Sequence, residues 1–267
     1  MEQIREKIKN AKRIVVKVGT STLTHANGKL NLQRIEHLAR VLSELKNQDR
    51  EVILVSSGAI GVGRVKLGMA DRPKTTMEKQ AAAAIGQCEL MNIYGKFFAE
   101  YGYSVAQLLL TRDVLDHNVR ETNAINTFNT ILSLGAVPIV NENDTVSTEQ
   151  IEFGDNDTLS AVVAVITKSD LLIILSDIDG FYDSDPHKNE NAKLIGCVEK
   201  ITGEIYSMAG SAGEMGTGGM QTKIKAAQIA NEKGIDMVIC SGENPEIVYN
   251  IIAGEEIGTL FLGGETR

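Results

Sequence analysis

Short apolar runs rich in β-branched residues recur along the chain and alternate with longer segments of helical spacing. Between the first two runs, apolar side chains return every three or four residues from Leu32 to Leu45, which predicts an amphipathic helix. Strand, helix and strand repeated in this order predict an α/β fold in which helices cover both faces of a mostly parallel sheet. The predicted strands occupy residues 13–18, 52–55, 104–110, 137–140, 171–175, 236–240 and 257–262.

The strand at 171–175 and the helical segment at 74–101 have the most informative patterns. L-L-I-I-L (171–175) contains no polar residue, as expected of a central strand that is buried on both faces. Residues 74–101 predict one long helix, or two helices with a break near Gly86. Four consecutive alanines, Ala81 to Ala84, give this segment a small face that would pack closely against a partner subunit or within the same subunit.

Composition narrows the class of protein. The 267 residues suffice for one large domain or two joined lobes, and the formal charge is -8, from 27 basic and 35 acidic residues. This balance argues against nucleic acid or an anionic membrane as a partner. The apolar runs are too short to span a bilayer, and the N-terminus is too polar for a signal peptide. The three cysteines form no C-x-x-C pair, so a reducing, cytoplasmic location is expected.

A lysine stands near the carboxyl end of the first strand, in V-V-K-V-G-T-S (15–21). Ligands of open α/β sheets gather beyond the carboxyl ends of the strands, so Lys17 would project into a binding crevice. Gly19 would let the backbone approach a phosphate closely. The alternative is a strand with one solvated lysine followed by a polar turn.

The second strand runs into a glycine-rich turn, S-S-G-A-I-G-V-G (56–63). Small residues before a helix leave the free N–H groups of its first turn accessible, which suits an anion or a substrate. A dinucleotide-binding fingerprint is excluded, because the third glycine is missing and the turn follows the second strand instead of the first.

Two neighbouring segments, N-E-N-D-T-V (141–146) and F-G-D-N-D-T-L-S-A (153–161), are dense in carboxylates and amides. Asp155 is expected to cap the helix that follows it. Capping leaves the remaining groups unexplained, and they would bind an ammonium group or orient a lysine. Turn formation is the plainer alternative, and the spacing fits no EF-hand loop. The dense positions are Asn141, Glu142, Asn143, Asp144, Asp155, Asn156 and Asp157.

The carboxyl-terminal third offers a second set of phosphate-binding features. The strand at 171–175 ends in Ser176 and Asp177, where nucleotide contacts are expected. Further on, G-T-G-G-M-Q-T-K (216–223) leads into an alanine-rich helix with Lys223 about one turn inside. The segment is not a P-loop, because Gly218 is followed by glycine and not by lysine.

No His, Cys or Ser is arranged as an activated nucleophile beside these segments. Phosphoryl transfer needs mainly positioning and positive charge, and little covalent chemistry from the protein. Two lysines at glycine-rich turns therefore predict a kinase that does not use the common P-loop.

Taken in order, these motifs resemble the glutamate 5-kinase group of the amino acid kinase family over nearly the whole chain. The resemblance implies a three-layer α/β/α sandwich and a single amino acid kinase domain over residues 1–267. A lobe of about 1–168 would bind the amino acid, and a lobe of about 169–267 would bind the nucleotide. The implied reaction is ATP-dependent phosphorylation of the γ-carboxylate of L-glutamate to γ-glutamyl phosphate and ADP, the first step towards proline.

The resemblance also implies a role for each motif residue. The catalytic residues would be Lys17, Lys223 and Asp157, with Asp157 holding the two lysines in place. The glutamate-binding residues would be Ser57, Gly58, Asp144 and Asn156. The nucleotide-binding residues would be Lys17, Ser176, Asp177, Thr217, Gly218, Gly219, Met220, Gln221, Thr222 and Lys223.

Further expectations follow from the same resemblance. ATP would carry Mg²⁺ on its phosphates, with no metal site formed by the protein itself. Proline would act as a feedback inhibitor, and the protein would form a dimer or tetramer. Many relatives carry a C-terminal PUA-type domain, which this chain is expected to lack.

The alternative functions are those of a family member acting on N-acetylglutamate, aspartate or carbamate, or of a non-catalytic amino-acid sensor. The acid-rich loops favour a substrate with a free ammonium group.

Overall fold

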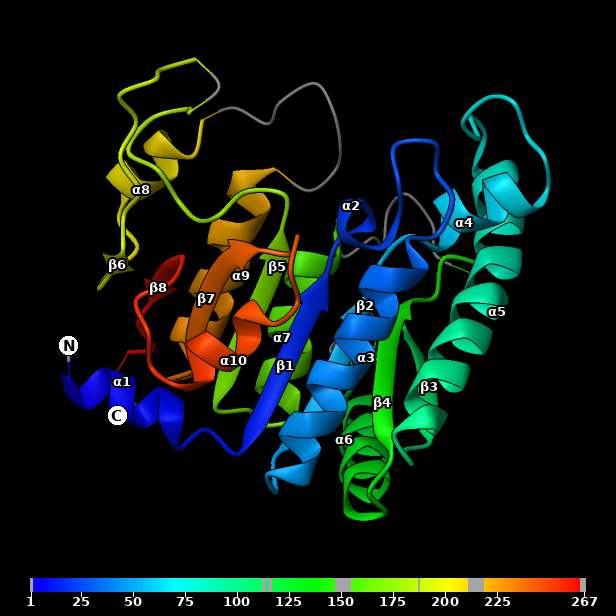
Figure 1. Ribbon diagram of the computed structural model, residues 1–267, viewed down its shortest axis with the longest axis horizontal. Coiled ribbons are helices and arrows are strands. Elements are labelled where there is room, and N and C mark those ends of the chain that lie inside the picture. Colours follow the sequence, from blue (N-terminus) through cyan, green and yellow to red (C-terminus); the bar gives the residue numbers. More distant parts are fainter. Residues whose placement is uncertain are drawn as a thin grey trace.

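The computed structural model describes residues 2–111, 114, 117–146, 155–186, 188–210 and 219–264. Its centre is an eight-stranded sheet with helices on both faces (Figure 1). The strand order is β3-β4-β2-β1-β5-β7-β8-β6, and all pairs are parallel except β7 with β8. The expected three-layer α/β/α architecture with a mostly parallel sheet is confirmed. The strands are β1 Arg13–Val18, β2 Glu51–Ser56, β3 Val105–Leu110, β4 Val137–Glu142, β5 Leu171–Ser176, β6 Cys197–Val198, β7 Asp236–Ser241 and β8 Thr259–Phe261.

The helices bury two separate apolar clusters, one against each face of the sheet. None of the described helices is long and apolar enough to cross a bilayer. The helices of the first cluster are α1 Glu2–Lys9, α2 Thr20–Leu23, α3 Leu32–Asn47, α4 Ala59–Lys66, α5 Thr76–Glu100 and α10 Ile247–Ile252. Those of the second cluster are α6 Asn118–Ser133, α7 Asn156–Ile166, α8 Gly203–Met208 and α9 Met220–Asn231.

The alternation of side chains along β1 decides which helices Lys17 can reach. Successive side chains of a strand point to opposite faces of the sheet. Val16 and Val18 belong to the cluster under α3, whereas Val15 belongs to the cluster under α7 and α9. Lys17 shares the face of Val15 and is therefore directed towards α7 and α9.

The strand order places a crevice beside β1. The chain proceeds from β1 to β2 on one side of the sheet and returns with β5 on the other side of β1. Neighbouring strands whose connections leave in opposite directions open a gap at their carboxyl ends, where ligands bind in open α/β sheets. β1 and β5 are such a pair, so the ends of both strands and the helices near them are the region to examine.

Helix α5 runs unbroken from Thr76 to Glu100, so the break considered near Gly86 does not occur. Glycine is needed there for a different reason. A Cβ atom on Gly86 would lie 1.8 Å from the carbonyl oxygen of Ala59 in α4, and a Cβ on Gly63 would lie 1.8 Å from that of Ala82 in α5. The two helices therefore meet backbone to backbone. Ala82 and Ala83 are buried in this contact within the subunit, and the other two alanines of the run are exposed.

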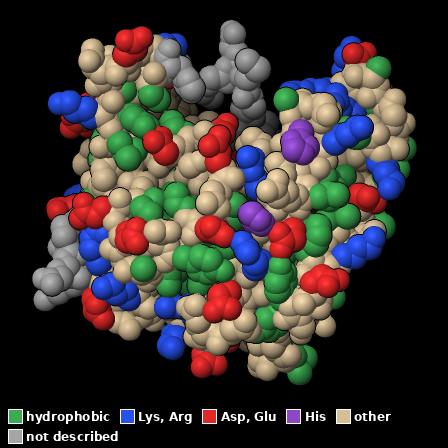
Figure 2. Space-filling model, viewed as in Figure 1, with side chains coloured by type: hydrophobic (Ala, Val, Ile, Leu, Met, Phe, Trp, Pro, Cys, Tyr) green, Lys and Arg blue, Asp and Glu red, His purple; other side chains and the backbone are tan. Residues whose placement is uncertain are grey.

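Charged side chains of both signs are interspersed over the face of the molecule that carries α3 and α10 (Figure 2). Exposed pairs such as Arg40 of α3 with Glu246, at 2.6 Å, lie at the surface. At the carboxyl end of the sheet, by contrast, charged groups are in contact while buried.

Candidate active site

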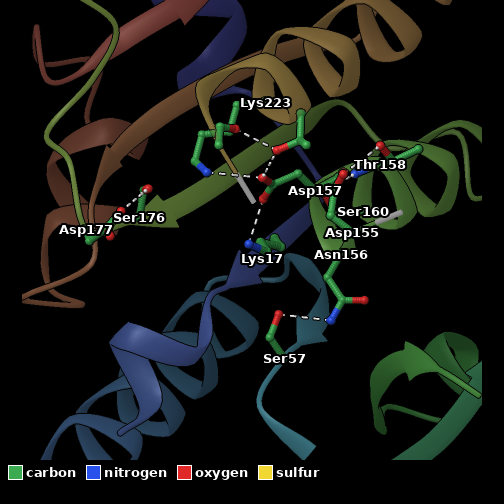
Figure 3. Close-up of polar contacts among 12 residues, drawn as sticks. Lys17, Ser57, Asp155, Asn156, Asp157, Thr158, Ser160, Ser176, Asp177 and Lys223 are labelled. Atoms are coloured by element: carbon green, nitrogen blue, oxygen red, sulfur yellow. Dashed lines mark hydrogen bonds and ion pairs between the residues drawn. The ribbon is translucent and has the colours of Figure 1, made fainter. Parts of the chain in front are cut away.

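Three charged side chains from three separate elements converge at the carboxyl end of β1 (Figure 3). Lys17 comes from β1, Asp157 from the first turn of α7 and Lys223 from the first turn of α9. The ammonium nitrogen of Lys17 lies 2.6 Å from Oδ1 of Asp157, and that of Lys223 lies 3.1 Å from Oδ2. A single carboxylate thus holds two ammonium groups that are far apart in the sequence.

All three groups are buried. Asp157 has no exposed surface, and Lys17 and Lys223 are 7% and 5% exposed. Burial by itself raises the pKa of the Asp157 carboxyl, but the charges of the two lysines outweigh it and hold this pKa below its ordinary range. Asp157 is consequently ionised at neutral pH, and its charge keeps both ammonium groups in place.

Thr222 adds a third contact to the same carboxylate. Its hydroxyl lies 2.9 Å from Oδ2 of Asp157 and 2.7 Å from the carbonyl oxygen of Gly219. The sequence had suggested a nucleotide contact for Thr222, and the structure directs its hydroxyl towards Asp157. Since this threonine precedes Lys223, it fixes the start of α9 relative to α7.

The N-terminus of α7 is closed by Asp155. Its Oδ1 accepts a hydrogen bond of 2.9 Å from the backbone N–H of Thr158, which confirms the predicted helix cap. Burial raises the pKa of Asp155, and the nearby negative charge of Asp157 raises it further. Two acidic groups two residues apart therefore shift in opposite directions, because only Asp157 is in contact with lysine.

Asn156 connects α7 to the turn after β2. Its Nδ2 lies 2.9 Å from Oγ of Ser57 and 3.1 Å from the carbonyl oxygen of Ser56. A carbonyl oxygen only accepts hydrogen bonds, so the group facing it must be the NH₂ of the carboxamide. Figure 3 shows the Asn156 carbonyl oxygen turned away from Ser57.

Gly58 occupies the position before α4 with a φ of 94°, a left-handed conformation that favours glycine. This turn brings Ser57, which is 8% exposed, to the carboxyl end of the sheet. Asp144 is half-buried in the turn that follows β4, at the same end of the sheet. The predicted glutamate-binding residues thus come from the ends of β2 and β4 and from the start of α7.

Of the described residues predicted to bind the nucleotide, Lys17 lies in β1 and the others lie at the end of β5 or the start of α9. Oγ of Ser176 donates a hydrogen bond of 3.1 Å to Oδ1 of Asp177, and both stand at the end of β5 (Figure 3). Gly219 precedes α9, while Met220 and Gln221 open it, and the Gln221 side chain donates to the carbonyl oxygen of Gly210. The remaining two predicted positions, Thr217 and Gly218, lie outside the described residues.

Two buried polar residues of α5 contact this region without having been expected from the sequence. Nδ2 of Asn141 donates a hydrogen bond of 2.9 Å to Oε1 of Gln87, and the hydroxyl of Tyr94 lies 2.9 Å from Oγ of Ser56. The signal available in the sequence was a glutamine and a tyrosine on the buried face of a helix that is otherwise apolar there. Asn141 had been noted as part of a polar segment but had no assigned role.

Comparisons with known proteins find relatives that are similar over nearly the whole chain. Residues 12–241 match the model of the amino acid kinase family. The chain is 57% identical to the glutamate 5-kinase of Clostridium perfringens (strain 13 / Type A) over 264 residues, which cover 97% of this chain and 98% of that protein. It is 53% identical to the glutamate 5-kinase of Listeria monocytogenes serotype 4a (strain HCC23), over 97% of this chain and 95% of that one.

Solved structures with a similar fold are more distant in sequence. A carbamate kinase from Giardia lamblia bound to AMP-PNP superposes with a TM-score of 0.66 at 16% identity, covering 95% of this chain and 99% of that one. A UMP kinase from Bacillus anthracis superposes with a TM-score of 0.65 at 17% identity, covering 95% and 96%. At these identities the similarity establishes the fold alone.

Proposed function

The chain belongs to the amino acid kinase family, and within it to the glutamate 5-kinases, and on this basis we propose that Lys17, Lys223 and Asp157 are its catalytic residues. The resemblance seen in the motifs is correct. The enzyme transfers the γ-phosphoryl group of ATP to the γ-carboxylate of L-glutamate, giving γ-glutamyl phosphate and ADP, the first step of proline biosynthesis. The observation that carries the catalytic assignment is the convergence of two lysines on one buried carboxylate.

The residues needed for this reaction follow from its charges. A glutamate γ-carboxyl has a pKa of about 4.3, so the nucleophile is already ionised and needs no general base. A carboxylate oxygen forms a bond to the γ-phosphorus while the bond from that phosphorus to the β–γ bridging oxygen breaks, and ADP leaves with the electron pair. The obstacle is repulsion between two anions. Lys17 and Lys223 would offset it, because both can contact the oxygens of the transferred group.

Asp157 would act as an organiser and not as a proton acceptor. Both of its carboxylate oxygens already face lysine nitrogens, and its lowered pKa makes it a poor base at neutral pH. Its role would be to fix the spacing and direction of the two ammonium groups before substrates arrive. Preorganised charge of this kind needs no rearrangement when the transition state forms.

Ser57, Gly58, Asp144 and Asn156 would bind glutamate. No hydrogen bond among the described residues uses the Asn156 carbonyl oxygen, since its neighbours Ser56 and Ser57 face the NH₂ group. A carbonyl oxygen can accept from an α-ammonium group, and the Asp144 carboxylate would attract the same charge. The turn at Gly58 would leave backbone N–H groups at the start of α4 for a carboxylate of the substrate.

Replacing Asp144 with alanine should raise the KM for glutamate while leaving kcat and the KM for ATP largely unchanged. The reason is that Asp144 is proposed to attract the substrate ammonium group and to take no part in the developing phosphoryl charge. Steady-state kinetics with each substrate varied in turn would measure this. A loss confined to kcat would contradict the assignment.

The nucleotide would lie along the other half of the crevice, bound by Ser176, Asp177 and residues 217–223. The first strand of the proposed nucleotide lobe, β5, is next to β1, and α9 carries Lys223 from that lobe to the shared carboxylate. Residues of about 1–168 would therefore form the amino-acid lobe and about 169–267 the nucleotide lobe. Transfer would take place where the two lobes meet.

Mg²⁺ would be bound through the phosphate oxygens of ATP. The carboxylate nearest the proposed phosphoryl position is Asp157, and both of its oxygens are engaged by lysines. Among the described residues, no group of three or more His, Cys, Asp and Glu side chains is placed to hold a metal ion. A phosphate-bound Mg²⁺ would supply further neutralisation of charge, and the chain's own contribution would be the two lysines.

The function is tested by trapping the acyl phosphate with hydroxylamine in the presence of ATP. Glutamate should give γ-glutamyl hydroxamate, whereas N-acetylglutamate, aspartate and carbamate should give little product. The same assay with added proline tests the proposed feedback inhibition. The proposed proline site is the segment 141–157, of which residues 147–154 lie outside the described residues.

A cytoplasmic location is also proposed, because the three cysteines are all free thiols.

We also propose that the protein is a homo-oligomer that pairs through the outer face of α5, at the right edge of Figure 1. Met77 and Ile85 are 76% and 38% exposed, and Ala81, Ala84 and Cys88 complete an exposed stripe at helical spacing. Contiguous exposed apolar surface of this kind commonly marks an interface.

The double variant Met77→Glu and Ile85→Glu should therefore lower the molar mass measured by light scattering to that of the monomer. The substitution Val119→Glu, at a 73%-exposed position on α6, should leave the mass unchanged. A monomeric wild-type protein would contradict the proposal.

A further inference from the structure

A chain of three carboxamides, two of them buried, runs from α5 to the start of α7. Oε1 of Gln87 accepts a hydrogen bond of 2.9 Å from Nδ2 of Asn141, and Oδ1 of Asn141 lies 2.9 Å from Nδ2 of Asn156. Gln87 is 8% exposed and Asn141 is 2% exposed. Gln87 thus lies two hydrogen bonds away from a residue proposed to bind glutamate.

The orientation of each carboxamide in this chain is determined by its neighbours. Oδ1 of Asn141 accepts from both Asn156 and the backbone N–H of Glu142, at 2.9 Å each. The NH₂ of Asn141 must therefore face Gln87, which has to offer its oxygen. In the same way, the Asn156 NH₂ faces three acceptors, Ser56, Ser57 and Asn141, and its carbonyl oxygen is left directed elsewhere.

We propose that Gln87 is a positioning residue for the glutamate site, which fixes Asn141 and through it Asn156 so that the Asn156 carbonyl oxygen faces the substrate α-ammonium group. The inference rests on the proposed role of Asn156. Without the acceptor on Gln87, the buried NH₂ of Asn141 would lack a partner in its present orientation. Turning the Asn141 carboxamide over would remove the unpaired NH₂ from that end but would place it against the NH₂ of Asn156.

The expected effect is confined to the binding of glutamate, and within glutamate to its α-ammonium group. Asn156 would lose its fixed orientation and would no longer present a reliable acceptor to the ammonium group. The contacts of Lys17 and Lys223 with Asp157 involve none of the three carboxamides. Gln87 should accordingly affect the recognition of glutamate and not the binding of ATP or the transfer step.

The test replaces Gln87 with Met, which is close in size but lacks the oxygen acceptor, and with Glu, which retains it. Gln87→Met should raise the KM for glutamate by about 10- to 100-fold, the effect of losing one hydrogen bond to a charged group. Its kcat and its KM for ATP should stay close to those of the wild type. Gln87→Glu, which keeps the acceptor, should have a KM for glutamate much closer to that of the wild type. Glutarate, which lacks the α-ammonium group, should inhibit the wild type and Gln87→Met with similar inhibition constants.

Two controls separate positioning from simple destabilisation. Phe98→Leu disturbs a fully buried side chain further along the same helix, so it should lower the melting temperature without changing the KM for glutamate. Gln87→Asn, which is polar but too short to reach Asn141, replaces Gln87→Met if the latter does not fold.

An unchanged KM for glutamate in Gln87→Met, an equal rise in Gln87→Met and Gln87→Glu, or an equal loss of glutarate binding would each overturn the inference. In any of these cases a wild type that phosphorylates glutamate leaves the proposed function intact. A wild type that produces no γ-glutamyl hydroxamate would instead refute the proposed function.

Discussion

Replacing either Lys17 or Lys223 with alanine is expected to lower kcat by at least ~10²-fold, about the effect of losing one preorganised donor to the transition state. Each lysine is nearly fully buried, and each points its ammonium group at the same carboxylate. A surface lysine or a cation from solvent therefore cannot take the place of a missing ammonium group. Single-turnover measurement of the phosphoryl transfer step would report the loss directly, because it separates chemistry from product release.

Three further variants sharpen this prediction. Arginine at either position should rescue poorly, since a wide planar guanidinium does not fit the space of a compact ammonium group. Lys66→Ala is a matched control on α4, because Lys66 is exposed and its ion pair with Glu89 at 3.0 Å lies on the surface. Near-normal turnover in the Lys17 or the Lys223 variant would remove that lysine from the mechanism.

The substitution Asp157→Asn is expected to lower the free energy of unfolding by about 3–5 kcal/mol, as is typical when one partner of a buried ion pair is removed. It leaves two buried ammonium groups without the charge that holds them, and it should also reduce kcat by loosening both lysines. Urea unfolding at neutral pH, compared with the wild type, would measure the change, provided that the slope with urea stays constant. A free energy of unfolding equal to that of the wild type would contradict the proposed role.

The same variant has a characteristic pH dependence. The pKa of Asp157 is lower in the folded protein than its unfolded value of about 3.9, so the ionised form is favoured by folding. This contribution is fully present above the unfolded pKa and is lost as the pH falls through the folded pKa. The stability difference between the wild type and Asp157→Asn should therefore be constant near neutral pH and diminish below about pH 4. A difference that instead grew in acid would have the wrong sign.

The strands were predictable from the sequence wherever they are buried on both faces. The runs 13–18 and 171–175 coincide with β1 and β5 to within a residue, because each is rich in Val, Ile or Leu and stands between polar residues or glycine. β6 was missed because it has two residues, Cys197 and Val198, and pairs with β8 alone. Its existence depends on a partner strand and not on any local pattern.

Glycine was harder to interpret than the apolar runs. Gly86 weakens helix propensity, which is why a break was considered there, but its lack of a side chain is what allows α4 and α5 to touch. Propensity is a local property, whereas close approach depends on a helix more than twenty residues earlier in the chain. The structure alone distinguishes these two reasons for a glycine.

The charged residues of the site could be predicted because each lies at or next to the end of an element. Lys17 stands one residue before the end of β1, and Asp157 and Lys223 lie in the first turns of α7 and α9, where ligands of α/β proteins are bound. Gln87 lies in the middle of a long helix, and its hydrogen bond to Asn141 spans 54 positions. No spacing rule connects those two residues, so only the folded backbone could bring them to attention.

The backbone contact between α4 and α5 has a consequence for how the enzyme tolerates change. Side chains that interlock can be exchanged for others of similar volume, but a carbonyl oxygen pressed against a glycine leaves no volume to redistribute. The turn at Gly58, which precedes α4, is thereby held at a fixed distance from α5. Substitutions should therefore be tolerated least at Gly63 and Gly86, and most at exposed positions of α5 outside the stripe proposed to form the interface.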